Sequence, residues 1–308
     1  MPSGNYSLSI CIPVFRQDVR NLVNQLSEQV DNVNIPVEIL IADDGSPEEF
    51  MVINRDCANE RNILFFGNTI NVGRAAIRNF LARHSKGSHL LFLDGDSSIE
   101  LSDFLSKYIE CINTNPDAVW CGGTYFPIHK ADSVHSLHFR YGNQVVARLH
   151  SHQDKNGRFF FMSSNFMIPS QVFIAIGFDE NIRDYGHEDT LFGCRLEQNL
   201  IPVLSVQNAV MHDDLDTNGV FIHKTEQSVR NLRSLISLPQ YKDCLQKTSL
   251  VKSFLFFGKW RLAGLYRIFF GMIIPLVLHN LRGAKPSLNL LQAYKLYLMV
   301  NHGHEDRV

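Results

Sequence analysis

The sequence predicts an α/β fold in which helices flank a mainly parallel central sheet, followed by a C-terminal helical extension. Short apolar runs alternate with amphipathic stretches through the first half of the chain, as in successive βαβ units. A length of 308 residues suits one large α/β domain with an appendage. A shift in composition between residues 225 and 245 marks the expected boundary, so we expect a main domain over 1–225 and a helical extension over 226–308.

The expected elements follow from hydrophobic periodicity. Strands are expected over 8–14, 37–42, 63–66, 89–93, 118–125 and 159–168. Helices are expected after Asp18 and over 74–84, 102–113 and 186–199. Another helix should begin at a capping box, with Ser46 as N-cap, Pro47 in the first turn and Glu49 reaching back.

The net charge of −2 argues against nonspecific binding to nucleic acid, which needs clustered Lys and Arg. The charge is unevenly distributed along the chain. Residues 244–304 contain eight basic residues and no Asp or Glu, whereas the rest of the chain carries 21 basic and 31 acidic residues. The basic surplus therefore belongs to the C-terminal extension.

The six cysteines form no CxxC pair, and the N-terminus has no basic segment followed by an apolar one. Both features favour a reduced, cytoplasmic location. No uninterrupted apolar run reaches the roughly eighteen residues of a spanning helix. We therefore expect no transmembrane segment.

Aromatic and aliphatic residues are mixed with Lys and Arg over 251–285. This pattern is typical of a helix at an anionic membrane interface and would place the protein at the inner face of the plasma membrane. The alternative is a helical pair packed on the main domain or on a partner chain. A homo-oligomer is compatible with the sequence.

Two acidic clusters follow expected strands: Asp43 with Asp44, and Asp94 with Asp96. In open α/β sheets, ligands bind outside the carboxyl ends of the strands. Paired carboxylates there can hold Mn²⁺ or Mg²⁺ together with substrate phosphates and water. The alternative is that each cluster is a solvated turn.

These clusters occur in an ordered set of motifs. The segment 9–15 (Ser-Ile-Cys-Ile-Pro-Val-Phe) comes first, then 41–46 (Ile-Ala-Asp-Asp-Gly-Ser), 71–74 (Asn-Val-Gly-Arg) with 76–79, and 93–96 (Leu-Asp-Gly-Asp). The set resembles the inverting family 2 of nucleotide-sugar glycosyltransferases, which have the GT-A fold. The resemblance covers about residues 7–215, and implies a nucleotide-binding half over 1–100 and an acceptor-binding half over 101–225.

The resemblance also implies roles for individual residues. The nucleotide-sugar donor would be bound by Pro13, Phe15, Asp43, Asp44, Asn71, Gly73, Arg74, Arg78 and Asp94. Asp96 would be the direct metal ligand, with Asp94 acting through water. For Pro13 and Asn71, simple turn chemistry is the alternative.

Farther along, Gly186 and His187 precede Glu188 and Asp189. In the resembling family a Glu-Asp pair at this place provides an acceptor contact and the catalytic base, so Asp189 is expected as base and Glu188 as acceptor-binding residue. The segment is also similar to that of galactosyl- and N-acetylgalactosaminyltransferases. The alternative for Asp189 is a carboxylate that complements the helix dipole.

Two further positions follow from the resemblance. Ser164 and Asn165 would lie under the donor sugar, and a polar turn is the alternative. His212 occupies the place where several relatives supply a third metal ligand, although a lone His is more often structural.

The resemblance thus implies an inverting transfer of a hexose from a UDP-sugar to a hydroxyl of a glycan or lipid-linked acceptor, in cell-surface polysaccharide synthesis. The hexose would be Gal or GalNAc, or else Glc or GlcNAc. Two other functions remain open from the sequence. One is a haloacid-dehalogenase-like phosphatase with Asp94 as nucleophile, and the other is a catalytically silent sugar- or nucleotide-binding module.

Overall fold

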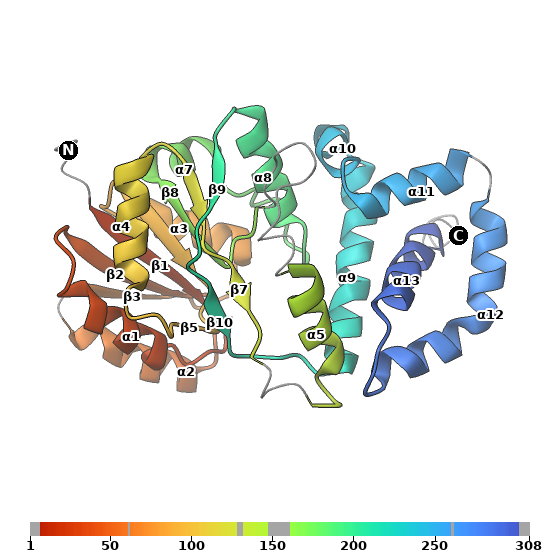
Figure 1. Ribbon diagram of the computed structural model, residues 1–308, viewed down its shortest axis with the longest axis horizontal. Helices are drawn as coiled ribbons and strands as arrows, with labels where there is room; N and C mark the ends of the chain where they lie inside the picture. The colour runs from red at the N-terminus through yellow and green to blue at the C-terminus, as the bar shows by residue number, and fades with distance from the viewer. Residues whose placement is uncertain (1–6, 61, 128–131, 147–160, 260–261, 302–308) are drawn as a thin grey trace. The chain divides into compact units, whose positions relative to one another are not determined.

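The computed structural model of the protein describes residues 7–60, 62–127, 132–146, 161–259 and 262–301 (Figure 1). The chain forms two compact units. The first comprises Met1–Phe126, Val146–Arg183 and Phe192–Asp214, and the second comprises Pro127–Val145, Asp184–Leu191 and Leu215–Val308. The second unit therefore includes two segments from the middle of the chain besides the C-terminal part. A shift in composition along the sequence could not reveal these segments, because it does not show which residues pack together.

The first unit is built on a seven-stranded sheet with strand order β3-β2-β1-β4-β8-β6-β9. The strands are β1 (Leu8–Val14), β2 (Val37–Asp43), β3 (Ile63–Gly67), β4 (His89–Leu93), β6 (Val119–Cys121), β8 (Asn165–Pro169) and β9 (Val203–Ser205). β8 runs antiparallel to both β4 and β6, and the other neighbouring pairs are parallel. The expected α/β fold with a mainly parallel central sheet is confirmed.

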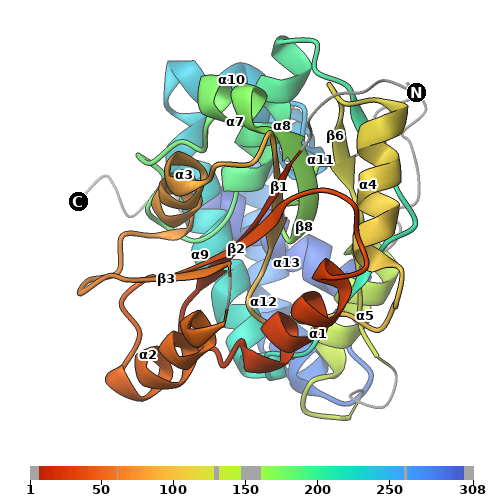
Figure 2. The same ribbon diagram turned by 90° about the vertical axis from the view of Figure 1, so that its left-hand side faces the viewer.

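Helices cover both faces of this sheet (Figure 2). Side chains of α1 (Arg20–Val30) and α4 (Phe104–Thr114) pack on one face, where they meet the even-numbered β1 residues such as Ile10 and Ile12. Side chains of α3 (Arg74–His84) and α7 (Ser170–Ile176) pack on the other, which receives Cys11. Because successive strand residues point to opposite faces, both faces of these apolar strands are buried.

A second sheet has the order β5-β10-β7 and consists of β5 (Ser97–Ser98), β7 (Thr124–Tyr125) and β10 (Val210–His212). β10 is antiparallel to β5 and parallel to β7. This small sheet fixes the backbone immediately after the end of β4. It therefore decides which residues stand beside the second acidic cluster.

The strands expected as β1, β3 and β4 and the helix expected as α3 are confirmed. The capping box expected at Ser46 is wrong. Helix α2 (Glu48–Arg55) begins after Pro47, and no side chain caps its first turn. The Ser46 hydroxyl instead accepts a hydrogen bond from the Arg16 N–H at 2.7 Å. The Ser46 hydroxyl is thus used to join the ends of two neighbouring strands.

The strand expected over 118–125 is divided into β6 and β7 at Gly122. A Cβ atom at Gly122 would collide with the Tyr108 hydroxyl and the Asn165 amide, so the chain passes these groups too closely for a side chain. The strand expected over 159–168 is shorter, because β8 begins at Asn165; residues 159–160 lie outside the described residues.

The second unit is mostly helical. Its helices are α5 (Ser136–Tyr141), α9 (Asn218–Ile236), α10 (Pro239–Leu245), α11 (Ser249–Lys259), α12 (Ala263–Arg282) and α13 (Leu288–Asn301). The long helix α9 packs against α5, α10, α12 and α13. The expected helical C-terminal extension is therefore present, and α9 is its central element.

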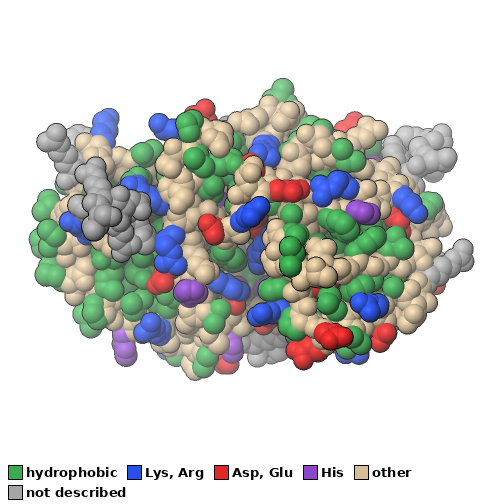
Figure 3. All heavy atoms as spheres, turned by 180° about the vertical axis from the view of Figure 1, so that it is seen from behind, with side chains coloured by type: hydrophobic (Ala, Val, Ile, Leu, Met, Phe, Trp, Pro, Cys, Tyr) green, Lys and Arg blue, Asp and Glu red, His purple; other side chains and the backbone are tan. Residues whose placement is uncertain are grey.

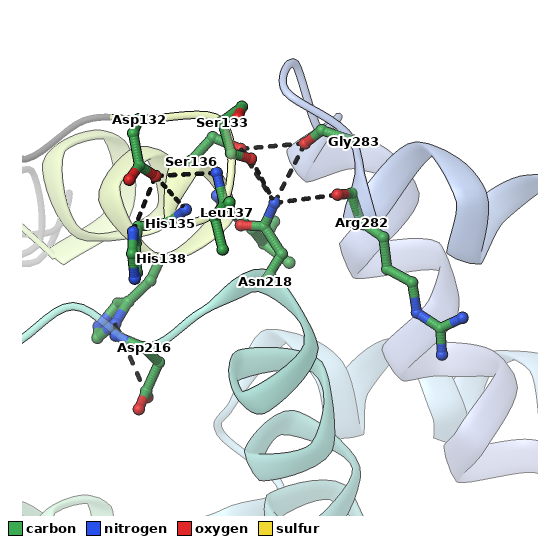
Figure 4. A network of polar contacts seen from close by, with 11 residues as sticks. Asp132, Ser133, His135, Ser136, Leu137, His138, Asp216, Asn218, Arg282 and Gly283 are labelled. Atoms are coloured by element: carbon green, nitrogen blue, oxygen red, sulfur yellow. Dashed lines mark hydrogen bonds and ion pairs between the residues drawn. The ribbon is translucent and has the colours of Figure 1, made fainter.

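Asn218, the first residue of α9, joins three parts of this unit (Figure 4). Its amide nitrogen donates to the carbonyl oxygens of Ser133 and Gly283, and its amide oxygen accepts the Leu137 N–H at 2.8 Å. Asn218 is 3% exposed. A single buried amide thus ties α9 to the start of α5 and to the turn after α12.

Helix α12 is 20 residues long with a mean hydropathy of 1.4, so by length and composition it is the one described helix that could cross a membrane. The uninterrupted apolar run within it, residues 268–278, is shorter than the roughly eighteen residues of a spanning helix and contains Gly271 and Pro275. Cys11, Cys57, Cys111 and Cys121 are free and buried.

Candidate active site

The carboxyl end of β2 carries Asp43 and Asp44, which are both buried. Asp44 accepts the N–H of Val72 at 2.7 Å with one oxygen and the N–H of Gly73 at 3.0 Å with the other. Burial raises the pKa of Asp44, although these two N–H groups oppose the rise. Asp44 therefore holds the loop that precedes α3.

This loop passes close to the turn after β2. Gly45 has a φ of +78°, and a Cβ atom there would lie 2.7 Å from the Asn71 nitrogen. Only glycine combines this backbone conformation with so close an approach. Gly73, with a φ of +94°, then precedes the first turn of α3. Gly45, Asn71 and Gly73 thus shape the loop through their backbones, while the Asn71 side chain is exposed.

Asp43 differs from its neighbour. One of its oxygens accepts the Ser46 N–H at 2.7 Å, and the other, Oδ2, is buried without a hydrogen-bond partner among the described residues. A buried carboxylate oxygen that lacks a donor is uncommon. A polar group of a ligand could supply that donor.

β1 ends beside this turn, because Val14 pairs with Asp43 and its carbonyl accepts the Asp44 N–H at 2.8 Å. Pro13 is half-buried within β1. Phe15, which follows the strand, is 44% exposed, and the Arg16 guanidinium lies 5.1 Å from its ring centroid. An exposed aromatic ring at a strand end can stack on a flat ligand such as a nucleobase.

At the end of β4, Asp94 forms an ion pair with Arg78 of α3. The Arg78 guanidinium donates to Asp94 Oδ1 at 2.6 Å, and the Arg78 side chain is only 3% exposed. The Asp94 N–H bonds to the Ser164 carbonyl at 3.0 Å. Asp94 is therefore held by an arginine that is itself inside the protein.

Asp96 lies next to His212, and β-sheet pairing explains why. β10 pairs with β5 so that His212 stands opposite Ser97, and the Asp213 N–H donates to the Asp96 carbonyl at 2.8 Å. His212 Nδ1 is 3.3 Å from Asp96 Oδ1. More than a hundred residues of sequence separate the two side chains that this pairing brings together.

The two groups change each other's acidity. Burial raises the pKa of Asp96, but the His212 ring and the Arg74 charge outweigh it, so the pKa lies below its usual range. Burial lowers the pKa of His212, but the Asp96 carboxylate outweighs it, so that pKa is raised. The site thus favours a positive charge beside Asp96, as a cation site would.

The described residues contain no group of three or more His, Cys, Asp and Glu side chains that could hold a metal ion. Arg78 binds one oxygen of Asp94, so the expected water-mediated contact of Asp94 with a metal ion would use the other oxygen. Asp96 and His212 alone still fit a divalent cation. Asp96 Oδ1 is buried beside His212 Nδ1, and diphosphate oxygens and water commonly complete such a shell.

Ser164 precedes β8 and Asn165 is its first residue. Their side chains differ in how far they are available for contact with a ligand. Asn165 is 1% exposed; its amide nitrogen donates to the carbonyls of Gly123 and Asn208, and its amide oxygen accepts the Tyr108 hydroxyl at 2.5 Å. Asn165 thus fixes the chain around β8 and β6 from inside the protein. Ser164 is half-buried, and its hydroxyl lies 2.9 Å from that of Thr124, so donor contact is better suited to Ser164.

The Glu188-Asp189 pair begins α8 (Glu188–Gln198). The two preceding residues have positive φ values, +92° at Gly186 and +76° at His187. Glu188 is buried and Asp189 is half-buried. A sharp left-handed turn therefore presents the two carboxylates at the first turn of the helix, where the helix dipole stabilises negative charge.

Helix α9 holds this turn in place, which the sequence did not reveal. Asn231 donates from its amide to the Gly186 carbonyl at 2.8 Å, and the His187 ring nitrogen Nε2 lies 3.0 Å from the Ser228 carbonyl. A Cβ atom at Gly186 would lie 2.7 Å from the Ser228 hydroxyl. Ser228 and Asn231 are spaced as neighbours on one helix face, but nothing local in the sequence links them to residues 186–189.

Comparison with known proteins places these features in a family. The sequence model described as glycosyl transferase family 2 matches residues 9–177, more than half of the chain. An uncharacterized glycosyltransferase of Rickettsia felis is 33% identical over 93 residues, which is 29% of this chain and 14% of that protein. The glucosyl-dolichyl phosphate glucuronosyltransferase of Haloferax volcanii is 30% identical over 92 residues, or 30% of this chain and 29% of that protein. The chain thus spans less than a third of the length of these two relatives.

Solved structures agree on the fold. A mannosyltransferase from Pyrobaculum calidifontis, in complex with GDP-mannose and Mn²⁺, superposes with a TM-score of 0.61 at 12% identity, covering 100% of this chain and 89% of that one. Glucosyl-3-phosphoglycerate synthase from Mycobacterium tuberculosis, in complex with Mn²⁺, UDP and phosphoglyceric acid, gives 0.52 at 13% identity, with coverage of 75% and 78%. The fold is therefore GT-A, as the motifs implied.

Proposed function

Because the chain belongs to glycosyl transferase family 2, we propose that it is an inverting glycosyltransferase that moves a hexose from a UDP-sugar to a hydroxyl of a glycan or lipid-linked acceptor. The observation that carries the proposal is the strand-end site in which the buried Asp96 Oδ1 pairs with His212 Nδ1 at 3.3 Å. Such a site suits a Mn²⁺ or Mg²⁺ ion shared with a diphosphate.

The nucleoside would lie at the ends of β1 and β2. Phe15 offers an exposed ring for stacking, and Asp43 Oδ2 is an acceptor that awaits a donor such as a base N–H or a ribose hydroxyl. Asp44 contributes by holding the backbone of Val72 and Gly73. In this assignment Asp44 is a positioning residue.

The diphosphate would lie near Asp96, His212 and Arg74. Arg74 begins α3, is exposed and lies close enough to Asp96 to lower the pKa of that carboxyl. When bound, a divalent cation held by Asp96 and His212 would stabilise the negative charge that develops on the departing diphosphate. Arg78 keeps Asp94 in place, so Asp94 would reach the ribose or a metal-bound water only with its second oxygen.

Asp189 is proposed as the general base. Its carboxylate would take the proton of the acceptor hydroxyl as that oxygen attacks the anomeric carbon, while the bond from this carbon to the diphosphate oxygen breaks. Attack opposite the leaving group inverts the anomeric configuration. Glu188 would bind the acceptor, and the tether from Asn231 to Gly186 would keep both carboxylates at the start of α8.

The donor sugar is the finer part of the proposal. The Gly186-to-Asp189 segment favours galactose or N-acetylgalactosamine, with glucose or N-acetylglucosamine as the alternative. A role in cell-surface polysaccharide synthesis, and action at the cytoplasmic face of the membrane, are parts of the same proposal.

The direct test is a panel of UDP- and GDP-sugars incubated with the protein and Mn²⁺, with release of the nucleoside diphosphate measured by mass spectrometry. We expect slow, Mn²⁺-dependent UDP release from one or two UDP-hexoses. Release of inorganic phosphate from sugar phosphates would support the phosphatase alternative instead. Donor binding without any release, even with candidate lipid-linked acceptors, would indicate a silent binding module.

A further inference from the structure

Helix α12 has an apolar face that no other described part of its unit covers. Its side chains are large and aliphatic or aromatic, they recur at the three- and four-residue spacing of one helix face, and each is between 42% and 71% exposed. They are Leu265, Ile268, Phe269, Met272, Ile273 and Leu276. We call this set the α12 stripe. Single exposed apolar residues are ordinary on protein surfaces, but six in a continuous stripe mark a contact surface.

The opposite side of α12 is firmly packed, so the orientation of the stripe is determined. Phe270 and Val277 are buried. The Tyr266 hydroxyl donates to the Ala293 carbonyl of α13 at 2.8 Å, and the Phe270 and Tyr297 ring centroids are 5.6 Å apart. Rotating the stripe inward would break these contacts with α13.

Helix α11 extends the apolar surface. Leu255 and Phe256 are 44% and 55% exposed, and α11 packs against both α12 and α13. In Figure 3, which is seen from behind, hydrophobic side chains gather along the left-hand edge, which corresponds to the right-hand edge with α12 in Figure 1. The stripe is thus the main part of a larger apolar surface formed by two helices.

The two helices that form this surface carry basic residues and no acidic ones. Residues 244–304 contain eight basic residues and no acid, and Lys252, Lys259 and Arg282 are exposed. A groove of about 470 Å³ beside α11 is lined by Arg233 and Lys242 together with Phe254 and Leu255. Lysine and arginine next to exposed apolar side chains match the headgroup and acyl layers of an anionic membrane.

We propose that the α12 stripe binds the surface of an anionic phospholipid membrane, with α12 lying in the interface. In a crossing orientation α12 would have to leave α13 or take it into the membrane, because one side of α12 is bound to α13. A symmetric contact with a second copy of the chain would bring the same basic residues together, whereas anionic headgroups would neutralise them. The binding itself does not require transfer chemistry.

The test is sedimentation of the full chain with vesicles of phosphatidylcholine containing 30% phosphatidylglycerol, compared with pure phosphatidylcholine. We expect binding to the anionic vesicles, and a loss of at least tenfold in affinity for the double variant Phe269→Glu with Met272→Glu. The matched control is Ile174→Glu, which changes a 64% exposed apolar residue on α7 and should leave binding unchanged. Lys252→Gln with Lys259→Gln should weaken binding to anionic vesicles only.

Several results would overturn the proposal. They are a parent protein that stays in the supernatant with anionic vesicles, a double variant that binds like the parent, and a stripe-dependent dimer in light scattering without vesicle binding. Resistance of the bound protein to alkaline extraction would indicate a spanning helix. Met272→Cys carrying an environment-sensitive fluorophore provides a second readout that leaves the charge unchanged: its emission should shift to the blue only with anionic vesicles. The described free cysteines are buried, which favours labelling of the introduced thiol. Donor hydrolysis measured on the same variants separates failure of this proposal from failure of the proposed activity.

Discussion

The Arg78 guanidinium, 3% exposed inside the first unit, donates to Asp94 Oδ1 at 2.6 Å, and this contact decides how the second acidic cluster is used. Arg78 also donates to the Arg74 carbonyl and lies 5.6 Å from the Phe178 ring centroid. An arginine buried in this way needs its carboxylate partner. Asp94 is therefore held by Arg78, while the buried Asp96 Oδ1 pairs with His212.

Replacing Arg78 should therefore destabilise the protein. Arg78→Met removes the partner of Asp94, and we expect the free energy of unfolding to fall by about 2 kcal/mol, less than for a fully buried pair because Asp94 is 28% exposed. Urea denaturation measures the change. Arg83→Met, which breaks an exposed pair with Glu180, should change stability by less than about 1 kcal/mol. Equal effects of the two variants would refute the structural role of Arg78.

Asp96→Ala should abolish metal-dependent donor binding, because it removes the charged ligand that a cation and a diphosphate would share. Isothermal titration calorimetry with UDP in the presence and absence of Mn²⁺ measures the effect. The control is Asp103→Ala, which removes an exposed carboxylate paired with Lys107 and should leave UDP binding unchanged. The metal assignment fails if the Asp96 variant retains the UDP affinity of the parent with Mn²⁺, and trapping a phosphorylated Asp94 would establish the phosphatase alternative.

Asp189→Asn keeps the shape of the side chain and removes its basicity. General-base catalysis typically contributes about 10²- to 10⁴-fold, so kcat for transfer should fall by that range while UDP-sugar affinity stays within about threefold of the parent. Asp184→Asn, a change at an exposed residue just before the same turn, is the control. Loss of binding together with turnover would point to a role in starting α8, and near-parental transfer would make Glu188 the next candidate for the base.

The stability of the protein should also depend on pH through His89. Burial lowers the pKa of His89, although a hydrogen bond to the Pro116 carbonyl opposes the decrease. In the unfolded chain the ring regains its usual pKa of about 6.5 and takes up a proton first, so acidification below that value favours unfolding. Because of His89, the free energy of unfolding should therefore decrease as the pH falls from about 7 to about 5.

Urea denaturation at several pH values between 5 and 7 tests this prediction. His89→Gln should show a smaller loss of stability over that range than the parent. His187, whose pKa burial also lowers, retains its contribution in the variant, while His212 acts in the opposite direction because its pKa is raised. A variant whose pH dependence equals that of the parent would exclude His89 as a contributor.

The sequence determined the elements that form through local interactions. β1, β4 and α3 were predicted at their observed bounds, because an apolar run or a helical periodicity needs only neighbouring residues to be recognised. The ordered motifs around Asp44 and Asp96 likewise predicted the family and the fold. The predicted capping box was wrong because it considered only neighbouring residues. In the folded chain the Ser46 hydroxyl accepts the Arg16 N–H instead.

Only the tertiary structure decided how the candidate residues are used. Sheet pairing placed His212 beside Asp96, and Arg78 donates to one oxygen of Asp94. The Asn165 amide forms hydrogen bonds with Tyr108, Gly123 and Asn208 inside the protein. The anchoring of Gly186 by Asn231 was equally absent from the sequence pattern, and only the structure decided which residues of the expected interface helix form the exposed α12 stripe. These features depend on groups that are far apart in the chain. A sequence shows which residues are able to form a contact, but the partner of each residue is decided only when the chain folds.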